Sequence, residues 1–116
     1  MPKENPETPM RMTLPTQLVL RALLEQPTQE MYGLQICAAA GLASGTIHPI
    51  LARLETAGWL ESHWEDVDPK QEGRPRRRYY QLSRDGVVGA RNALARADAN
   101  RDALRLRPGM AGGVTI

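Results

Sequence analysis

Residues 31–58 contain two short helical patterns separated by only four residues, and this spacing limits the folds that are open to the chain. The segment 31-MYGLQICAAA-40 predicts one helix, with Leu34, Cys37 and Ala38 on its buried face. Gly41 is placed to end that helix in a left-handed conformation. The turn 41-GLAS-44 leads into a second helix, predicted over residues 45–58. Two helices joined by a short glycine-containing turn are the outline of a helix-turn-helix.

The second of these helices carries a regular apolar stripe. We expect its buried positions to be Ile47, Ile50, Leu51, Leu54 and either Ala57 or Gly58. Pro49 bears on where the helix begins. With Thr46 as N-cap, Pro49 takes the third helical position, where the backbone N–H has no helical partner anyway. With Ser44 as N-cap, the proline would remove a hydrogen bond. We therefore expect Thr46 to cap the helix.

Two alternating segments follow and predict a β-hairpin. They are 59-WLESHWE-65 and 77-RRYYQL-82, and the polar stretch 66-DVDPKQEGRPR-76 between them is rich in turn formers. A hairpin after a helix-turn-helix is a wing. One helix is predicted before this unit, over 15–26 with Pro15 at its first position, and another after it, over 84–107 with Ser83 as its cap. The predicted fold is mainly α with a small β-hairpin (α+β).

Composition adds three expectations. At 116 residues the chain is one domain, and its 4% of aromatic residues and lack of phenylalanine limit the core, which favours a partner subunit. The single cysteine and the absence of a long apolar run indicate a cytoplasmic protein. Residues 1–13 and 108–116 are predicted to be a flexible arm and a flexible tail.

Positive charge is concentrated in the second half of the chain. All of the 15 basic residues except Lys3 and Lys70 are arginine, and the run 73-GRPRRRYYQLS-83 places four arginines in five positions. The planar guanidinium fork matches phosphate and guanine edges, so this bias favours an anionic partner. A solvated hairpin, neutralised by Glu65, Asp66, Asp68 and Glu72, is the alternative.

Several separated blocks resemble one known family. They are 31-MYGLQI-36, 45-GTIHPILARLETAGWLES-62, Trp64-Glu65, 73-GRPRRRYYQLS-83 and Gly86, and over about residues 15–94 they are similar to the PadR-type winged helix-turn-helix regulators. The resemblance implies a homodimeric, DNA-binding repressor of bacterial type that associates with the nucleoid when bound. It also implies that the last helix, often with the first, makes the dimer, and that any effector binds near the dimer interface. Many members carry tyrosine, associated with operator contact, where this chain has Leu34 and His48.

These elements suggest a DNA-binding domain over residues 14–82 and a dimerisation helix over 83–107. The outward face of the third helix and the wing supply the candidate contacts to double-stranded DNA. They are Ser44, Thr46, His48, Pro49, Arg53, Arg74, Arg76 and Arg77. Arg78 is the least favoured of the wing arginines, because strand alternation places it on the face of Tyr80 and Leu82. A twofold dimer implies a palindromic operator.

Two further sets of residues carry expectations about partners. The candidate dimer contacts are Leu20, Val87, Ala90, Leu94, Ala97 and Leu104. Trp59 and Trp64 are expected to pack in the core, and the alternative is that they line a pocket for a small apolar effector. His48, His63 and Cys37 match no zinc spacing, and no catalytic constellation is present, so we expect no metal, cofactor or enzyme activity. The rival functions are a winged-helix protein-interaction module and a ligand sensor.

Overall fold

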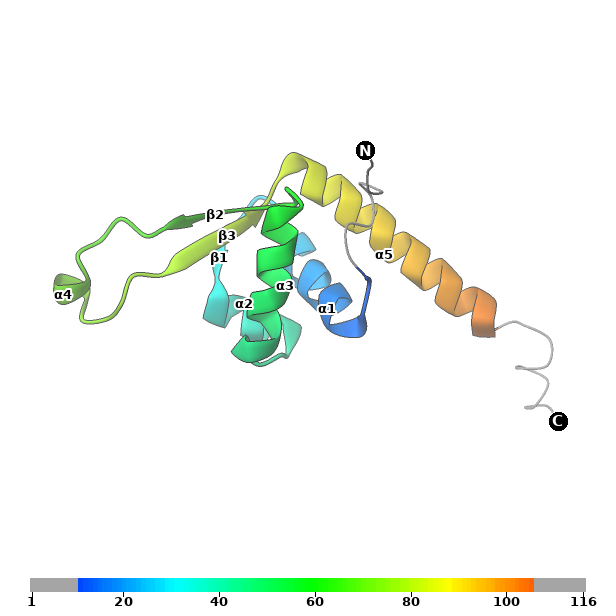
Figure 1. Ribbon diagram of the computed structural model, residues 1–116, viewed down its shortest axis with the longest axis horizontal. Coiled ribbons are helices and arrows are strands. Elements are labelled where there is room, and N and C mark those ends of the chain that lie inside the picture. The colour runs from blue at the N-terminus through cyan, green and yellow to red at the C-terminus, as the bar shows by residue number, and fades with distance from the viewer. Residues whose placement is uncertain (1–10, 106–116) are drawn as a thin grey trace.

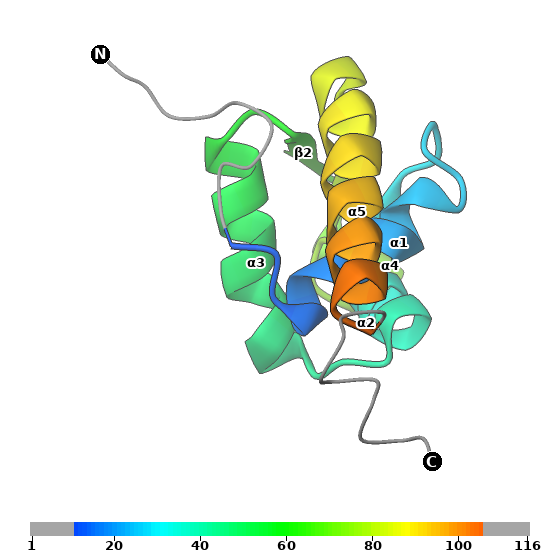
Figure 2. The same cartoon turned by 90° about the vertical axis from the view of Figure 1, so that its right-hand side faces the viewer.

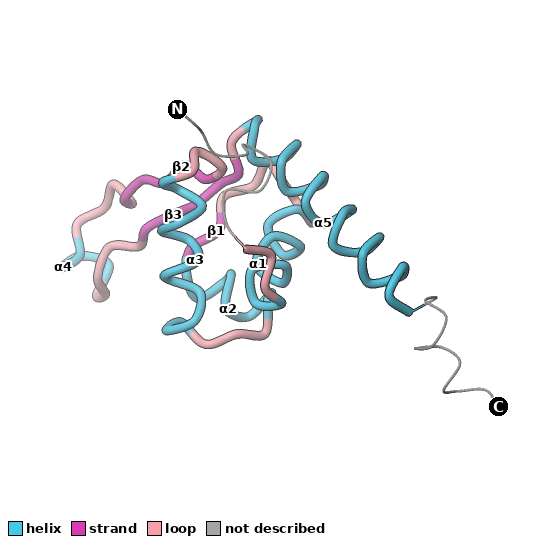
Figure 3. The backbone as a smooth tube through the Cα atoms, turned by 45° about the vertical axis from the view of Figure 1, so that its right-hand side comes forward, coloured by secondary structure: helices cyan, strands magenta, loops and turns pink. Residues whose placement is uncertain are grey.

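The computed structural model describes residues 11–105, in which a small sheet and three helices form the body of the molecule (Figure 1). The helices are α1 (Leu14–Leu24), α2 (Gly33–Ala40), α3 (Ser44–Thr56), α4 (Pro69–Glu72) and α5 (Arg84–Arg105), and the strands are β1 (Met31–Tyr32), β2 (Leu60–Trp64) and β3 (Arg78–Leu82). The sheet is antiparallel with the order β1-β3-β2. The hairpin of β2 and β3 projects from one side of the body and α5 from the other (Figures 1 and 3). The predicted α+β fold with a wing is confirmed.

The helix-turn-helix consists of α2, a three-residue turn and α3. Gly41 has φ of 72°, as predicted, and its N–H donates to the carbonyl of Cys37 at 2.8 Å. The axes of α2 and α3 make an angle of 109°, within the range of a helix-turn-helix. No single helix of residues 11–105 is long and apolar enough to cross a membrane. Only α2 and α3 taken together, across this bend, have the length and composition for it.

The start of α2 differs from the prediction. Met31 and Tyr32 are not helical, because they pair with Tyr80 and Tyr79 of β3 as a third strand. The buried face also differs: Ile36 is fully buried, whereas Leu34 is 71% exposed and Ala38 is exposed. Cys37 is half-buried. Pairing of the preceding residues with the sheet fixes the rotational setting of this short helix and turns Ile36 inward.

Helix α3 begins earlier than predicted, with Ala43 as N-cap. The N–H groups of Thr46 and Ile47 donate to the carbonyl of Ala43 at 3.0 and 3.1 Å, so Thr46 is helical and Pro49 lies inside the helix. The proline leaves the carbonyl of Gly45 without its helical donor. Both Gly45 and Pro49 are exposed, so water can reach that carbonyl.

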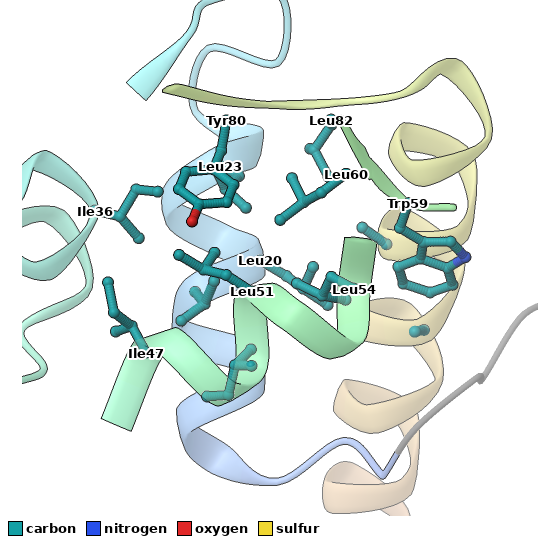
Figure 4. Close-up of a cluster of buried hydrophobic side chains, with 14 of the residues drawn as sticks. Leu20, Leu23, Ile36, Ile47, Leu51, Leu54, Trp59, Leu60, Tyr80 and Leu82 are labelled. Carbon is teal, nitrogen blue, oxygen red and sulfur yellow. The ribbon is translucent and has the colours of Figure 1, made fainter. Parts of the chain in front are cut away.

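The core lies between α1, α2, α3 and the sheet (Figure 4). The predicted stripe of α3 is confirmed at Ile47, Ile50, Leu51 and Leu54, which pack with Leu20, Leu23, Ile36, Leu60, Tyr80 and Leu82. Ala57 and Gly58 are exposed instead of buried, because the helix ends there: Gly58 has φ of 83°. The chain then turns into β2 at Trp59.

The hairpin strands are confirmed, but the tip holds an unpredicted helical turn, α4. Asp68 caps it by accepting a hydrogen bond from the N–H of Lys70 at 3.0 Å, and Gly73 ends it with φ of 72°. Of the predicted arm, residues 1–10 lie outside the described residues, and Met12 packs against the core. The tail 108–116 and the predicted end of the last helix at 107 also lie outside the described residues.

Helix α5 is held against Trp59 by close backbone packing. Ser83 caps the helix as predicted: its Oγ accepts from the N–H of Gly86 at 2.9 Å and donates to the carbonyl of Gly58 at 2.7 Å. A Cβ placed on Gly86 would lie 2.0 Å from the carbonyl oxygen of Trp59. One on Gly89 would lie 2.5 Å from the indole ring. Only glycine allows the helix to approach this closely. Figure 2 shows the resulting position of α5 alongside α1.

Gly86→Ala should lower the free energy of unfolding by about 2–4 kcal/mol, because a backbone carbonyl cannot yield as a flexible side chain can. Urea denaturation followed by far-UV circular dichroism measures the change. The matched control is Gly45→Ala, also in a helix but with open space around the added methyl group. That variant should be unchanged or more stable by up to about 1 kcal/mol. Equal stability of the two variants would contradict the close packing of α5.

Candidate nucleic-acid interface

Helix α3 presents its predicted contact residues to solvent, most of them in its N-terminal half. Ser44, Thr46, His48, Pro49 and Arg53 are all exposed. The imidazole of His48 lies next to the first residue of α2: a Cβ on Gly33 would be 3.5 Å from its Cε1. His48 therefore lies where the two helices of the motif meet.

Glu65 joins the two sides of the hairpin next to its tip through hydrogen bonds to Arg74 and Arg77, which we call the clasp. Glu65 accepts two hydrogen bonds from Arg74, at 2.7 and 3.0 Å, and a third from the backbone N–H of Arg77 at 3.1 Å. The N–H of Glu65 donates in turn to the carbonyl of Arg77 at 2.8 Å. The hydrogen bonds from Arg74, with a smaller contribution from the Arg77 N–H, lower the pKa of Glu65 to about 2. The same pair raises the pKa of Arg74.

The four wing arginines therefore have different surroundings. Arg74 is engaged by Glu65 and lies 3.6 Å from Glu72. Arg76 is exposed and donates from Nε to the carbonyl of Val67 at 2.8 Å. Arg77 lies over the ring of Tyr32, 4.2 Å from its centroid and next to the start of α2. Arg77 and Arg78 point to opposite faces of the hairpin, as predicted from strand alternation. Of the four arginines, only Arg74 is neutralised by acidic residues of the hairpin itself.

Arg78 links the wing to α3. Its Nη2 lies 3.5 Å from Oε2 of Glu55, which also accepts a hydrogen bond from Ser62 Oγ at 2.7 Å. On the opposite side of the sheet, His63 pairs with Glu30 at 2.5 Å, and this contact raises the pKa of His63. These tethers were not predicted, because they join residues far apart in the sequence.

The two tryptophans do not share a pocket. Trp59 is 3% exposed and packs in the core as predicted, whereas Trp64 is 59% exposed. The prediction that Trp64 is buried is wrong, because this end of the hairpin extends beyond the body, where no helix covers it (Figure 1).

Three of the predicted dimer contacts belong to the core of their own chain. Leu20, Ala90 and Leu94 are 0, 0 and 6% exposed, which leaves them no surface for a second copy. Val87 and Ala97 are half-buried and Leu104 is 47% exposed. The sequence pattern did not single out Val88, which is 57% exposed on α5. Residues 11–105 contain no cluster of three or more metal-ligating side chains.

A family model identifies the family to which the chain belongs. The family model described as "Transcriptional regulator PadR-like family" matches residues 19–92. A search of curated proteins finds no match.

Three solved structures share the fold of the chain. A PadR family transcription regulator from Clostridium difficile R20291 is 19% identical, with a TM-score of 0.62 over 80% of this chain and 96% of the other. BpsR of Bordetella bronchiseptica, whose DNA binding is regulated by 6-hydroxynicotinic acid, is 17% identical, with a TM-score of 0.61 over 89% and 74%. PcaV of Streptomyces coelicolor, a transcriptional regulator solved with its natural ligand, is 25% identical, with a TM-score of 0.58 over 89% and 68%.

The clasp predicts that Glu65 stays ionised at unusually low pH. Its pKa in the folded protein, about 2, lies below the ordinary value of 4.5, so its contribution to stability is present above pH 4.5 and is lost as the pH falls towards 2. In a carboxyl ¹³C NMR titration, Arg74→Ala should raise the midpoint of Glu65 towards 4.5. Arg76→Ala, which removes a neighbouring arginine outside the clasp, should leave it unchanged. A midpoint insensitive to Arg74 would rule out the clasp.

Proposed function

Because the chain belongs to the PadR-like family of transcriptional regulators, we propose that it acts in the cytoplasm as a homodimeric repressor on a palindromic operator. The observation that carries this proposal is the pair α2 and α3, which cross at 109° with the N-terminal half of α3 exposed. Helix N-terminal residues in this arrangement can reach base edges in the major groove. A dimer bound to a promoter blocks access to it, which is repression.

In this proposal the exposed end of α3 reads the bases of a half-site. His48 contacts a base edge, and Ser44, Thr46, Pro49 and Arg53 approach the bases or the adjacent phosphates. The position of His48 beside Gly33 supports this role, because it is held at the junction of the two helices rather than on a free helix end.

We propose different roles for the wing arginines. Arg76 and Arg77 contact phosphates or the minor groove beside the half-site, while Arg74 shapes the neck of the wing. The support is the clasp: both carboxylate oxygens of Glu65 accept hydrogen bonds from Arg74, whereas the guanidinium of Arg76 donates to one backbone carbonyl, through Nε. A guanidinium whose N–H groups are hydrogen-bonded to a carboxylate has fewer donors left for a phosphate.

We propose that residues 84–105 make the dimer and residues 14–82 the DNA-binding module. The C-terminal part of α5 runs beyond the body (Figure 1), and residues 99–105 are exposed. A helical extension with little packing is marginal by itself, and a second copy covering Val87, Val88, Ala97 and Leu104 would stabilise it.

A second proposal is that a small-molecule effector binds to the protein, and a hollow beside α5 favours it. Between the segment before α1 and the outer part of α5 lies an open hollow of about 810 Å³. Its lining combines apolar side chains such as Met12 and Leu104 with Arg11 and Arg101. DNA binding by BpsR is regulated by 6-hydroxynicotinic acid, and PcaV was solved with its natural ligand. We propose that a small molecule would bind here rather than between Trp59 and Trp64. Family membership argues against a protein-interaction module without DNA binding.

Selection of binding sites from random duplexes at stated salt tests the dimer and the role of His48 together. The wild-type chain should return an inverted repeat whose half-sites lie about 34 Å, or a multiple of it, apart. His48→Ala should return repeats with the same spacing but altered preference at one position of each half-site. Single, unrepeated sites would contradict the dimer, and an unchanged motif for the variant would contradict base reading by His48.

Arg76→Ala should weaken binding to operator and scrambled duplexes by a similar factor, because phosphate contacts carry no sequence information. The slope of log K against log salt should fall by about one unit. Fluorescence anisotropy with labelled duplexes at several salt concentrations measures both quantities. Arg84→Ala, which removes an exposed arginine at the start of α5, is the control and should leave the slope unchanged. Equal slopes for wild type and Arg76→Ala would exclude the proposed wing contact.

A further inference from the structure

Trp64 is the one aromatic residue of residues 11–105 that is largely exposed. The chain has two tryptophans, three tyrosines and no phenylalanine. Trp59 and Tyr80 are buried, and Tyr32 and Tyr79 are half-buried with an edge contact between their rings, 5.6 Å apart. Trp64, 59% exposed, lies outside this packing. An indole joins a large apolar ring to a polar N–H, a combination that is enriched at interfaces.

The position of Trp64 identifies which surface this is. Alternate residues of β2 share a face: Leu60 is buried under the sheet, and Ser62 bonds to Glu55 of α3. Trp64 continues the same face, so it lies on the inner side of the wing. Arg78, its cross-strand partner, lies 5.2 Å from the ring centroid and 3.5 Å from Glu55. The indole therefore lies at the outer end of β2, on the face of the wing that continues from Leu60 and Ser62.

An open hollow of about 900 Å³ adjoins the ring. It is lined by Trp64, Glu65, Asp66, Pro69, Pro75 and Arg76. The indole and the two prolines give it an apolar floor, Arg76 gives it a cationic edge, and the charge of Glu65 is already matched by Arg74.

We propose that this inner face of the wing packs against the sugar-phosphate backbone of the DNA strand beside the half-site. The indole of Trp64 lies against deoxyribose, and Arg76, which lines the same hollow, meets a neighbouring phosphate. This proposal rests on the DNA-binding function proposed above and adds an apolar contact to it. Sugar and phosphate contacts position a protein on the duplex without reading sequence.

DNA fits this surface better than a second copy of the chain does. Helix α5 extends from the side of the body opposite the wing (Figure 1), and it carries the exposed apolar residues Val88 and Leu104. A copy packed on α5 leaves Trp64 uncovered. The wing face also combines an apolar ring with an arginine, so it can meet the apolar side of a sugar and a phosphate together.

The two tryptophans allow a direct test by acrylamide quenching of fluorescence. In the free protein Trp64 should be quenched readily and Trp59 should not, and Trp64→Phe should remove the accessible emission. Adding either a selected operator or a scrambled duplex should protect Trp64 and leave Trp59 unchanged. Binding is followed separately by anisotropy of labelled DNA.

Three results would overturn the proposal. If DNA binds by anisotropy and Trp64 remains as accessible as in the free protein, the wing face is not a contact, although the proposed function stands. If Trp64 is already protected in the free protein at concentrations where it self-associates, a second copy covers it. If no duplex binds at all, the proposed function fails and this inference with it.

Affinity provides an independent readout. Trp64→Ala should weaken binding to operator and scrambled duplexes by the same factor, about tenfold, and Trp64→Phe should bind close to wild type. Leu14→Ala is the matched control, an exposed apolar side chain at the start of α1 rather than on the wing. It should bind both duplexes with wild-type affinity. Wild-type affinity for a folded Trp64→Ala variant would contradict the proposal.

Discussion

The arrangement of the whole molecule depends on the contact of α5 with Trp59. This residue follows the end of α3, precedes β2 and supplies the carbonyl that accepts the N–H of Ser83 at 2.9 Å. Gly86 and Gly89 allow α5 to approach so closely that neither has room for a methyl group. Trp59 thus sets the angles between α3, the wing formed by β2 and β3, and α5. In a symmetric dimer built on α5, the same contact would fix the distance between the two copies of α3.

The four arginines of the wing make different contacts, although they form one basic run in the sequence. Arg74 is held by a carboxylate, Arg78 joins β3 to Glu55 of α3, and Arg77 covers the ring of Tyr32. Arg76 is the one whose guanidinium is most open to an anion. Much of the run's charge therefore stabilises the shape of the hairpin, and the number of arginines overstates the number available to DNA.

Local patterns in the sequence were sufficient to predict most helices and strands, but not how these elements pack against one another. The spacing of Ile47, Ile50, Leu51 and Leu54 and the position of Gly41 predicted α3 and the turn before it, because these features depend on near neighbours. Strand β1 is too short for an alternating pattern to be visible. Pro49 favours a later helix start by its local preference, and the packing of α3 overrides it. The exposure of Trp64 and the burial of Leu20 and Leu94 depend on where distant elements end, which periodicity does not record.

The tethers of the wing have a consequence for binding that follows from entropy. Ordering a loop or a rotamer-rich side chain when a complex forms costs free energy, and a surface already held in shape avoids part of that cost. Glu65 with Arg74, Glu55 with Arg78 and His63 with Glu30 hold the hairpin at three points before any DNA is present. They also place Trp64 and Arg76 at the same hollow of the wing. Glu65, whose charge is matched by Arg74, therefore maintains the shape of the wing with little repulsion of a phosphate.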